Sequence, residues 1–304
     1  MKKVIIITGP TAVGKTKLSI KLAHLLKTEI ISGDAYQIYR NMNIGTAKPT
    51  MAEREGIIHH LMDIIDPSES YSVADYQTQV RSKIDDLTSR NLIPLIVGGS
   101  GLYIDSVIFD YQFNAPSRNQ EIESRFSGLD NESLHQHLAS LDAEAARNIH
   151  PNNRKRVLRA IELADSGYNY HHNKDRTKRL YQALIFFLND DRTTLYQQIN
   201  ARVDEMMKQG LLEEAEKIFH QPLSIQAAKT MGYQELFPYF KGEITLEEAV
   251  DQIKKNTRRY AKRQLTWFRN RDDVIQVMIN RENFDETINF VYQKSLSFIK
   301  GEKL

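Results

Sequence analysis

Cysteine is absent from this sequence of 304 residues. Without cysteine the chain has no disulfides, no cysteine-ligated zinc and no iron–sulfur cluster, and this composition is typical of a cytosolic protein. Long apolar runs are missing too. The run at the N-terminus extends only from Val4 to Ile7, which is too short for a signal peptide's apolar region or for a membrane span. We therefore expect a soluble cytoplasmic protein with no membrane partner.

An excess of charge of one sign is also lacking. The 41 Lys and Arg residues nearly balance the 39 Asp and Glu residues, so the formal net charge is only +2. Bulk charge therefore gives no sign of a nucleic-acid partner, and any such surface must come from local clustering of cations. Hydrophobic residues make up 41% of the chain, which is ordinary for a protein with a sizeable core.

Short β-branched runs alternate with helical patterns in the first third of the chain. These runs predict strands at residues 4–7, 29–32 and 92–97, and a further run predicts a returning strand at 181–188. Strands that alternate with helices indicate an α/β fold with a doubly wound parallel sheet. The stretch from 116 to 178 is helical and charged, with a helix that opens at Pro151. We therefore expect a core of residues 1–115 and 179–304 and an inserted helical domain of residues 116–178.

A phosphate-binding loop follows the first predicted strand. Residues 9–16 read GPTAVGKT and fit the pattern GxxxxGK[ST] between a strand and a helix start, as a P-loop requires. Its glycines let backbone N–H groups converge, Lys15 adds a positive charge, and the Thr16 hydroxyl is placed to ligate Mg²⁺. The core is therefore expected to be P-loop NTPase-like. The residues expected to bind the phosphates are Gly9, Pro10, Thr11, Ala12, Val13, Gly14, Lys15 and Thr16.

The partner that nucleotide hydrolases and kinases usually need is not evident. Such enzymes hold the metal with an Asp at the end of a second buried strand. Here the best apolar strand, 92–97, runs into Gly98-Gly99-Ser100-Gly101 instead. The stretch 61–66 is a poor substitute because Asp63 interrupts it. The P-loop is clear, but the usual ATPase carboxylate is missing.

A carboxylate follows the second predicted strand. Since ligands lie outside the carboxyl ends of parallel strands, Asp34 should face the same crevice as Lys15. The alternative is that Asp34 only caps a following helix. Gln37 and Tyr39 close behind it favour a working site, because Gln can pair with an adenine edge and Tyr can stack on a base.

A basic stripe is predicted near the C-terminus. Between Lys254 and Arg271 there are eight Lys or Arg residues and no acid. On a helical wheel the cations Lys254, Lys255, Arg258, Arg259, Lys262 and Arg263 fall on one half. The other half carries Ile253, Tyr260, Ala261, Trp267 and Phe268, while Leu265 lies at the edge of the basic half. A merely solvated face normally mixes both signs, so the stripe indicates a polyanion.

Together these stretches resemble the bacterial tRNA dimethylallyltransferase (tRNA isopentenyltransferase) family. The matching motifs run in order along nearly the whole chain. They are GPTAVGKT (9–16), SGDAYQIYR (32–40), IGTAKP (44–49), HHLMDIIDP (59–67), YSVADY (71–76), VGGSGLY (97–103), RVLRAIEL (156–163), the helix of Arg202, MGYQE (231–235) and KRQLTWFR (262–269). Two positions depart from the family pattern. Ala35 stands where Ser is usual, and Ser100 stands where Thr is usual.

The resemblance implies transfer of a dimethylallyl group from dimethylallyl diphosphate to the N6 amine of the adenosine immediately 3′ of the anticodon in tRNA. It implies that Asp34 is the general base, that Gln37 recognises the adenine, and that Ser100 contacts substrate in a central channel. Lys15, Thr16 and Arg202 would hold the diphosphate and its Mg²⁺, so the catalytic set is Asp34, Ser100 and Arg202. We expect a monomer that binds the anticodon stem-loop. The tRNA contacts expected from the resemblance and the basic stripe are Asp34, Ala35, Tyr36, Gln37, Ser100, Lys155, Arg156, Val157, Leu158, Arg159, Arg258, Arg259, Lys262 and Arg263.

Two other functions fit part of the sequence. A small-molecule or nucleoside kinase would share the P-loop and the sheet, but it does not explain the basic stripe. A non-catalytic RNA-binding protein with a structural P-loop would leave Asp34 beside Lys15 without a purpose.

Overall fold

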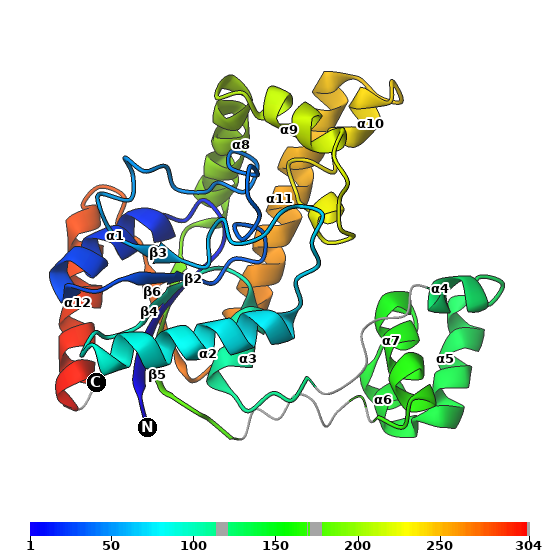
Figure 1. The fold of residues 1–304 in the computed structure, drawn as a ribbon, viewed down its shortest axis with the longest axis horizontal. Helices are drawn as coiled ribbons and strands as arrows, with labels where there is room; N and C mark the ends of the chain where they lie inside the picture. The colour runs from blue at the N-terminus through cyan, green and yellow to red at the C-terminus, as the bar shows by residue number, and fades with distance from the viewer. Residues whose placement is uncertain (114–120, 169, 171–177, 303–304) are drawn as a thin grey trace. The chain divides into compact units, whose positions relative to one another are not determined.

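The core of the protein is a six-stranded, entirely parallel sheet, seen in a computed structural model that describes residues 1–113, 121–168, 170 and 178–302 (Figure 1). The strand order is β3-β2-β4-β1-β5-β6, with the strand before the P-loop near the middle. The strands are β1 (Lys3–Thr8), β2 (Ile30–Ser32), β3 (His59–His60), β4 (Leu95–Val97), β5 (Gln182–Asn189) and β6 (Val274–Met278). The prediction of a doubly wound parallel sheet is confirmed.

The strands differ from the predicted runs in informative ways. β4 begins only at Leu95, directly after Pro94, which has no N–H to give to a neighbouring strand. The stretch 61–66 is not a strand, because Leu61 and Asp63 have φ values of 60° and 56°, which interrupt an extended chain. It contributes one isolated bridge, from Ile65 to Tyr39. β3 and β6 were not identified from the sequence.

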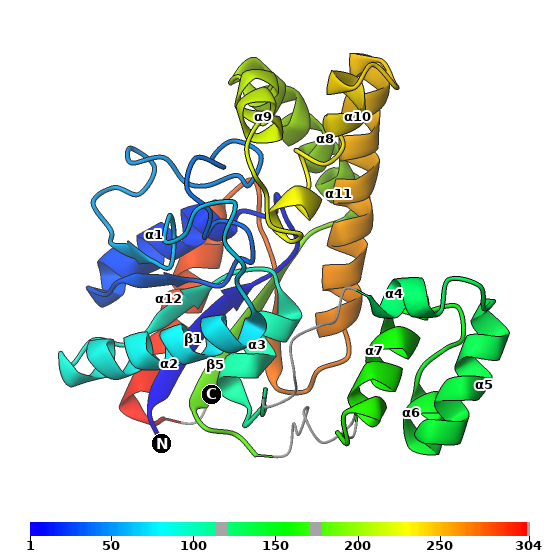
Figure 2. The ribbon, with the colours of Figure 1, turned by 45° about the vertical axis from the view of Figure 1, so that its right-hand side comes forward.

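Helices cover both faces of the sheet (Figures 1 and 2). On one face, α1 (Lys15–Leu26) and α12 (Phe284–Lys300) share a buried cluster with Ile5 and Ile7 of β1. The alternate residues of β1 point to the other face, along which α2 (Val73–Ser89) and α3 (Gly101–Ile108) lie. All four apolar residues from Val4 to Ile7 are fully buried, as a central parallel strand requires.

Beyond β5 the chain forms the helices that rise above the carboxyl ends of the strands (Figure 2). The longest is α11 (Leu246–Phe268), which Thr245 and Glu248 start with a capping box. Helix α11 packs against α8 on one side and against α3 on another. The remaining helices here are α8 (Arg192–Lys208), α9 (Leu211–Phe219), a 3₁₀ turn at Ala227–Lys229 and α10 (Phe237–Phe240).

Residues Phe109–Arg179 form a separate compact unit, and Met1–Ile108 with Leu180–Leu304 form the other. The insert therefore starts seven residues before the predicted position 116, which itself lies outside the described residues. Its described helices are α4 (Ile122–Arg125), α5 (Asn131–Leu141), α6 (Ala143–Asn148) and α7 (Arg154–Asp165). They enclose their own apolar core, which includes Leu134, Leu138 and Ile161. Helix α7 begins at Arg154 and not at Pro151, so that prediction was three residues early.

Among the helices in the described part of the chain, none is both long enough and apolar enough to cross a membrane.

Candidate active site

The P-loop joins β1 to α1 and turns through backbone conformations that favour glycine. Gly14, at the start of α1, has a φ of 99°, and Gly9 has a φ of 151°. A Cβ on Gly9 would lie 2.6 Å from the carbonyl oxygen of Leu188 on β5, so only glycine fits there. The two glycines therefore permit the tight turn that leads from β1 directly into the N-terminus of α1.

Lys15 folds back over this loop. Its Nζ donates to the carbonyl oxygens of Gly9 (2.9 Å) and Pro10 (2.7 Å). Burial lowers the pKa of Lys15 to about 7, and the nearby positive charge of Arg202 adds to this, while Asp34 acts in the opposite direction. A partly buried ammonium next to a partly buried guanidinium stabilises an anion, because the anion offsets the repulsion between them.

Asp34 lies at the end of β2 and faces Lys15, as the rule for parallel strand ends predicts. Its Oδ1 accepts hydrogen bonds from the backbone N–H groups of Tyr36 (2.9 Å) and Gln37 (3.3 Å). A turn follows Asp34 and not a helix, so the alternative of a helix cap is replaced by a turn-forming role. Burial raises the pKa of Asp34, and these two hydrogen bonds and Lys15 oppose that rise.

Eight of the predicted site residues, five of them in the P-loop, line one cavity of about 380 Å³. Its walls include Lys15, Thr16, Asp34, Gln37 and Arg202. The guanidinium of Arg202, on α8, lies 3.5 Å from the Thr11 hydroxyl of the P-loop. The structure therefore brings a phosphate loop, a carboxylate and an arginine from a distant helix into one crevice.

A smaller compartment of about 80 Å³ shares Asp34, Arg202 and Tyr260 with this cavity. Its other walls are mainly apolar, and they come from α8, α11, residues 45–47 and residues 230–232. The apolar wall residues are Ile199, Val203, Met206, Met231 and Ile253. A ligand with a polar anionic end and a short apolar end matches the two spaces, with Asp34 and Arg202 at the junction.

Gln37 is held by hydrogen bonds within the protein. Its Nε2 donates to the carbonyl oxygens of Thr46 (3.2 Å) and Ala47 (3.3 Å), and its Oε1 accepts from the Ser32 hydroxyl. To read an adenine edge, Gln37 would have to exchange some of these bonds. The prediction that Tyr39 stacks on a base is wrong, because its ring is fully buried. Tyr36 instead lines the smaller compartment.

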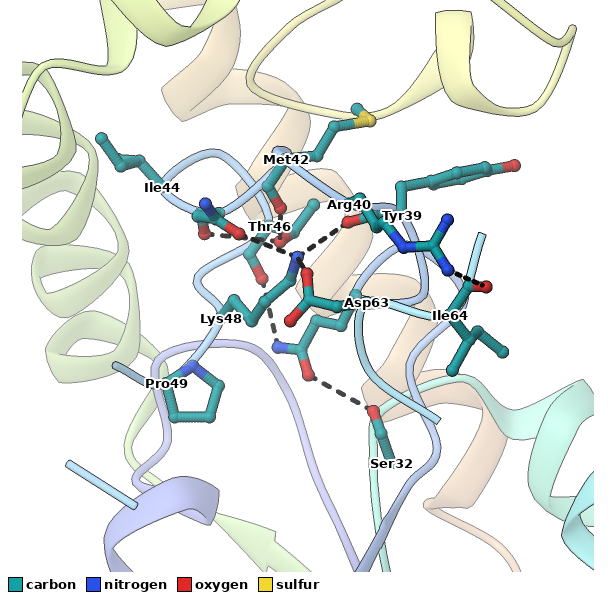
Figure 3. A network of polar contacts seen from close by, with 12 residues as sticks. Ser32, Tyr39, Arg40, Met42, Ile44, Thr46, Lys48, Pro49, Asp63 and Ile64 are labelled. Carbon is teal, nitrogen blue, oxygen red and sulfur yellow. Dashed lines mark hydrogen bonds and ion pairs between the residues drawn. The ribbon is translucent and has the colours of Figure 1, made fainter. Parts of the chain in front are cut away.

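The segment 43–49 that contacts Gln37 is itself fixed by a buried lysine (Figure 3). Lys48 Nζ donates to the carbonyl oxygen of Tyr39 (2.7 Å), to Asn43 Oδ1 (2.9 Å) and to Asp63 Oδ1. From the other side, Glu214 of α9 accepts the N–H groups of residues 43, 44 and 45. Lys48 and Glu214 are not among the site residues predicted from the sequence. Only the family motif at 44–49 drew attention to Lys48, and nothing local marks Glu214.

Ser100 follows β4 and lies against α11. Its hydroxyl is 3.4 Å from the Tyr260 hydroxyl. Burial raises the pKa of Tyr260. One turn further along α11, Gln264 bonds to both the P-loop and Gly99. The helical wheel placed Tyr260 on the core side and said nothing of Gln264. The signal that could have identified Gln264 is its position as a polar side chain on the apolar side of the helix.

The cations of α11 do not form the single exposed stripe that the helical wheel predicted. Arg258 is half-buried and donates to Asn200 of α8, and Lys254 pairs with Asp204 at 2.6 Å. Leu265 packs into the core cluster from that same side. The predicted exposure of Arg258 is therefore wrong. Arg259, Lys262 and Arg263 are exposed, and Arg263 stands 5.5 Å over the Tyr260 ring.

Of residues 155–159, the RNA contact predicted on the insert, only some have exposed side chains. Lys155 and Arg156 are exposed, and Arg159 pairs with Glu162 at 2.6 Å. Val157 and Leu158 are buried in the core of the insert, at 0% and 1% exposure. Side-chain contacts from these two residues to an external partner are therefore ruled out in this conformation, because they form one apolar face of α7.

Most of the chain matches a known protein family. The model of the IPP transferase family matches residues 37–271. A tRNA dimethylallyltransferase of Bacillus subtilis is 49% identical, with 89% of each chain covered. The protein of the same name from Bacillus cytotoxicus is 48% identical and covers 99% of this chain and 96% of its own.

The chain is also similar to solved structures of proteins with related names. A tRNA delta(2)-isopentenylpyrophosphate transferase from Staphylococcus epidermidis is 39% identical, with a TM-score of 0.74 over 98% of this chain and 99% of its own. A eukaryotic dimethylallyltransferase acting on tRNA is 27% identical, with a TM-score of 0.84 over 100% of this chain and 81% of its own.

Proposed function

Because this chain belongs to the IPP transferase family, it is a transferase, and we propose that it prenylates tRNA. The proposed reaction moves a dimethylallyl group from dimethylallyl diphosphate to the N6 amine of the adenosine immediately 3′ of the anticodon. The single observation that carries the proposal is that Lys15 of the P-loop and Asp34 line the same crevice. A phosphate site facing a partly buried carboxylate suits a reaction that releases diphosphate and a proton together.

The chemistry explains why both groups are needed. The exocyclic amine of adenine is a poor nucleophile, because its lone pair is delocalised into the ring. In the proposed step the N6–C1 bond forms as the C1–O bond breaks, and the electron pair of that bond leaves with the diphosphate. Asp34 accepts the N6 proton, so that no cationic amine accumulates. Lys15 and Arg202 stabilise the charge that grows on the diphosphate.

Magnesium fits this site as an ion carried by the diphosphate. In residues 1–113, 121–168, 170 and 178–302 there is no group of three or more His, Cys, Asp or Glu side chains able to hold a metal. Mg²⁺ normally keeps several waters and binds through substrate phosphates with one or two protein oxygens, so no such cage is needed. The Thr16 hydroxyl, in the wall of the crevice, is the protein oxygen we propose for it. The ion would offset diphosphate charge.

The donor is the first point to test. We expect radiolabel from dimethylallyl diphosphate to appear in unmodified tRNA while added ATP stays intact. Kinases hold their metal with an Asp at the end of a buried strand, and residues 61–66, the only stretch proposed for that role, do not form a strand. Filter-bound radioactivity measures the first quantity and chromatography of labelled ATP the second. Steady ATP hydrolysis with no prenyl transfer would favour the kinase alternative.

The exposed cations of α11 give a second test. Neutral substitution of Arg259, Lys262 or Arg263 should weaken tRNA binding and reduce the slope of log affinity against log salt by about one each. Arg258→Gln is the matched control, since that guanidinium is directed to Asn200. Affinities measured across a salt series would decide the matter. If Arg258→Gln flattened the slope as much as the others, the assignment of the exposed cations would be wrong.

A further inference from the structure

Three side chains of helix α11 contact residues 99–101, which follow β4 and Gly98. Tyr260 contacts Ser100, Gln264 donates from Nε2 to the carbonyl oxygen of Gly99 at 3.1 Å, and Trp267 lies against Gly101. These three side chains are spaced i, i+4 and i+7, so they lie on one face of the helix. Cβ atoms at Gly99 and Gly101 would overlap the Gln264 amide and the Trp267 indole. Glycine at both positions is what allows so close an approach.

The other end of the Gln264 amide reaches the P-loop. Its Oε1 accepts the backbone N–H of Thr11 at 3.0 Å, a contact between residues 253 positions apart. Gln264 is only 5% exposed, so both bonds are sheltered from water. One amide therefore joins the diphosphate loop to the loop that carries Ser100. Lys15 also binds this stretch of the P-loop, through the carbonyl oxygens of Gly9 and Pro10.

The chemistry of this bridge calls for an amide. The partner on the P-loop is a donor and the partner at Gly99 is an acceptor, so the bridging group must offer one acceptor and one donor. Leucine offers neither. A glutamate carboxylate could accept from Thr11, but it would set a negative oxygen against the Gly99 carbonyl. A buried group that loses its partner costs far more than an exposed one, so the bridge should matter to function.

We propose that Gln264 is a positioning residue that fixes the P-loop against residues 99–101, and that it couples RNA binding on α11 to the affinity for the prenyl diphosphate. The RNA side of this coupling is the exposed set Arg259, Lys262 and Arg263, which lies on the same helix and within one turn or two of Gln264. The inference rests on the proposed function, since it takes RNA and a prenyl diphosphate as the two ligands. By linkage, each ligand must raise affinity for the other by the same factor.

The test measures the affinity of dimethylallyl thiodiphosphate, a donor analogue that does not react, by calorimetry. Each protein is titrated with and without a saturating anticodon stem-loop RNA. We expect RNA to tighten analogue binding to the wild-type protein by about fivefold or more. Gln264→Leu should weaken analogue binding about tenfold and abolish the difference made by RNA. Gln264→Glu should restore neither the analogue affinity nor the effect of RNA.

Two further variants keep the result interpretable. Gln276→Leu removes a glutamine that donates to the Phe268 carbonyl at the last turn of α11, away from the crevice, and should behave as wild type. Gly99→Ala sets a Cβ in overlap with the Gln264 amide nitrogen without a change in the sequence of α11, and should reproduce the loss seen with Gln264→Leu. This variant carries the test if Gln264→Leu does not fold, as judged by circular dichroism.

Equal or tighter analogue binding by folded Gln264→Leu, or an unchanged RNA effect in it, would overturn the inference. So would a wild-type protein in which RNA leaves the analogue affinity unchanged. Failure of the proposed function looks different, because labelled dimethylallyl diphosphate would then give no labelled tRNA with the wild-type enzyme.

Discussion

Replacement of Asp34 by alanine is expected to reduce turnover by about 10²- to 10⁴-fold, the usual worth of a general base. Asp34 is the carboxylate that faces Lys15 in the crevice, and in the proposed reaction it takes up the proton that the amine loses. Binding of tRNA and of the donor should change much less, since the proposed role of Asp34 is to accept a proton as the bond forms. Single-turnover rates at saturating substrates, with both affinities measured in parallel, give the comparison.

Asp34→Asn separates the base from the turn. An asparagine Oδ1 can still accept the N–H groups of Tyr36 and Gln37, but the amide cannot take up a proton. If Asp34 served only the turn, Asp34→Asn would retain near wild-type turnover. We expect it to be nearly as slow as Asp34→Ala.

The pH dependence of turnover should also report Asp34. Burial raises its pKa above the ordinary value of an aspartate. The base works in its ionised form, so the single-turnover rate should fall as the pH drops through this raised pKa. The fall should therefore occur at a higher pH than that of an exposed aspartate. An acid limb at the pKa of an exposed aspartate would contradict the burial seen here.

Replacement of Lys15 by methionine should reduce turnover by about 10²- to 10³-fold, the size of effect seen when one preorganised group is removed from a site of developing charge. Methionine keeps much of the length of the side chain and removes its charge. Donor affinity should fall as well, because Lys15 lies in the wall of the crevice where the diphosphate is proposed to bind. Steady-state rates over a range of donor concentrations separate the two effects.

Lys21→Met is the matched control for this lysine. Lys21 lies on the same helix and also lines the cavity, but its Nζ pairs with Glu55 at 3.0 Å. Its charge is therefore already offset, and we expect only a small loss. Equal losses in both variants would mean that the general positive potential of the crevice matters, and not the position of Lys15.

The sequence by itself determined the parts of this protein that depend on local backbone geometry. The P-loop follows from glycines at fixed spacing between an apolar strand and a helix, and the structure places residues 9–14 between β1 and α1 as predicted. The placement of Asp34 opposite Lys15 follows from one further rule, that parallel strands end on the same side of a sheet. Arg202 was placed at the site by the family resemblance alone, since no local pattern marks it.

Only the tertiary structure decided which side chains of α11 and α7 are free to bind a partner. A helical wheel assumes a single buried face, but α11 packs against α8 and α3 on different sides, which takes Arg258 out of the stripe and brings Leu265 into the core. The Gln264 bridge and the Glu214 support of residues 43–45 join positions more than 150 residues apart. Such contacts depend on how distant elements pack, and nothing in the local sequence specifies that packing.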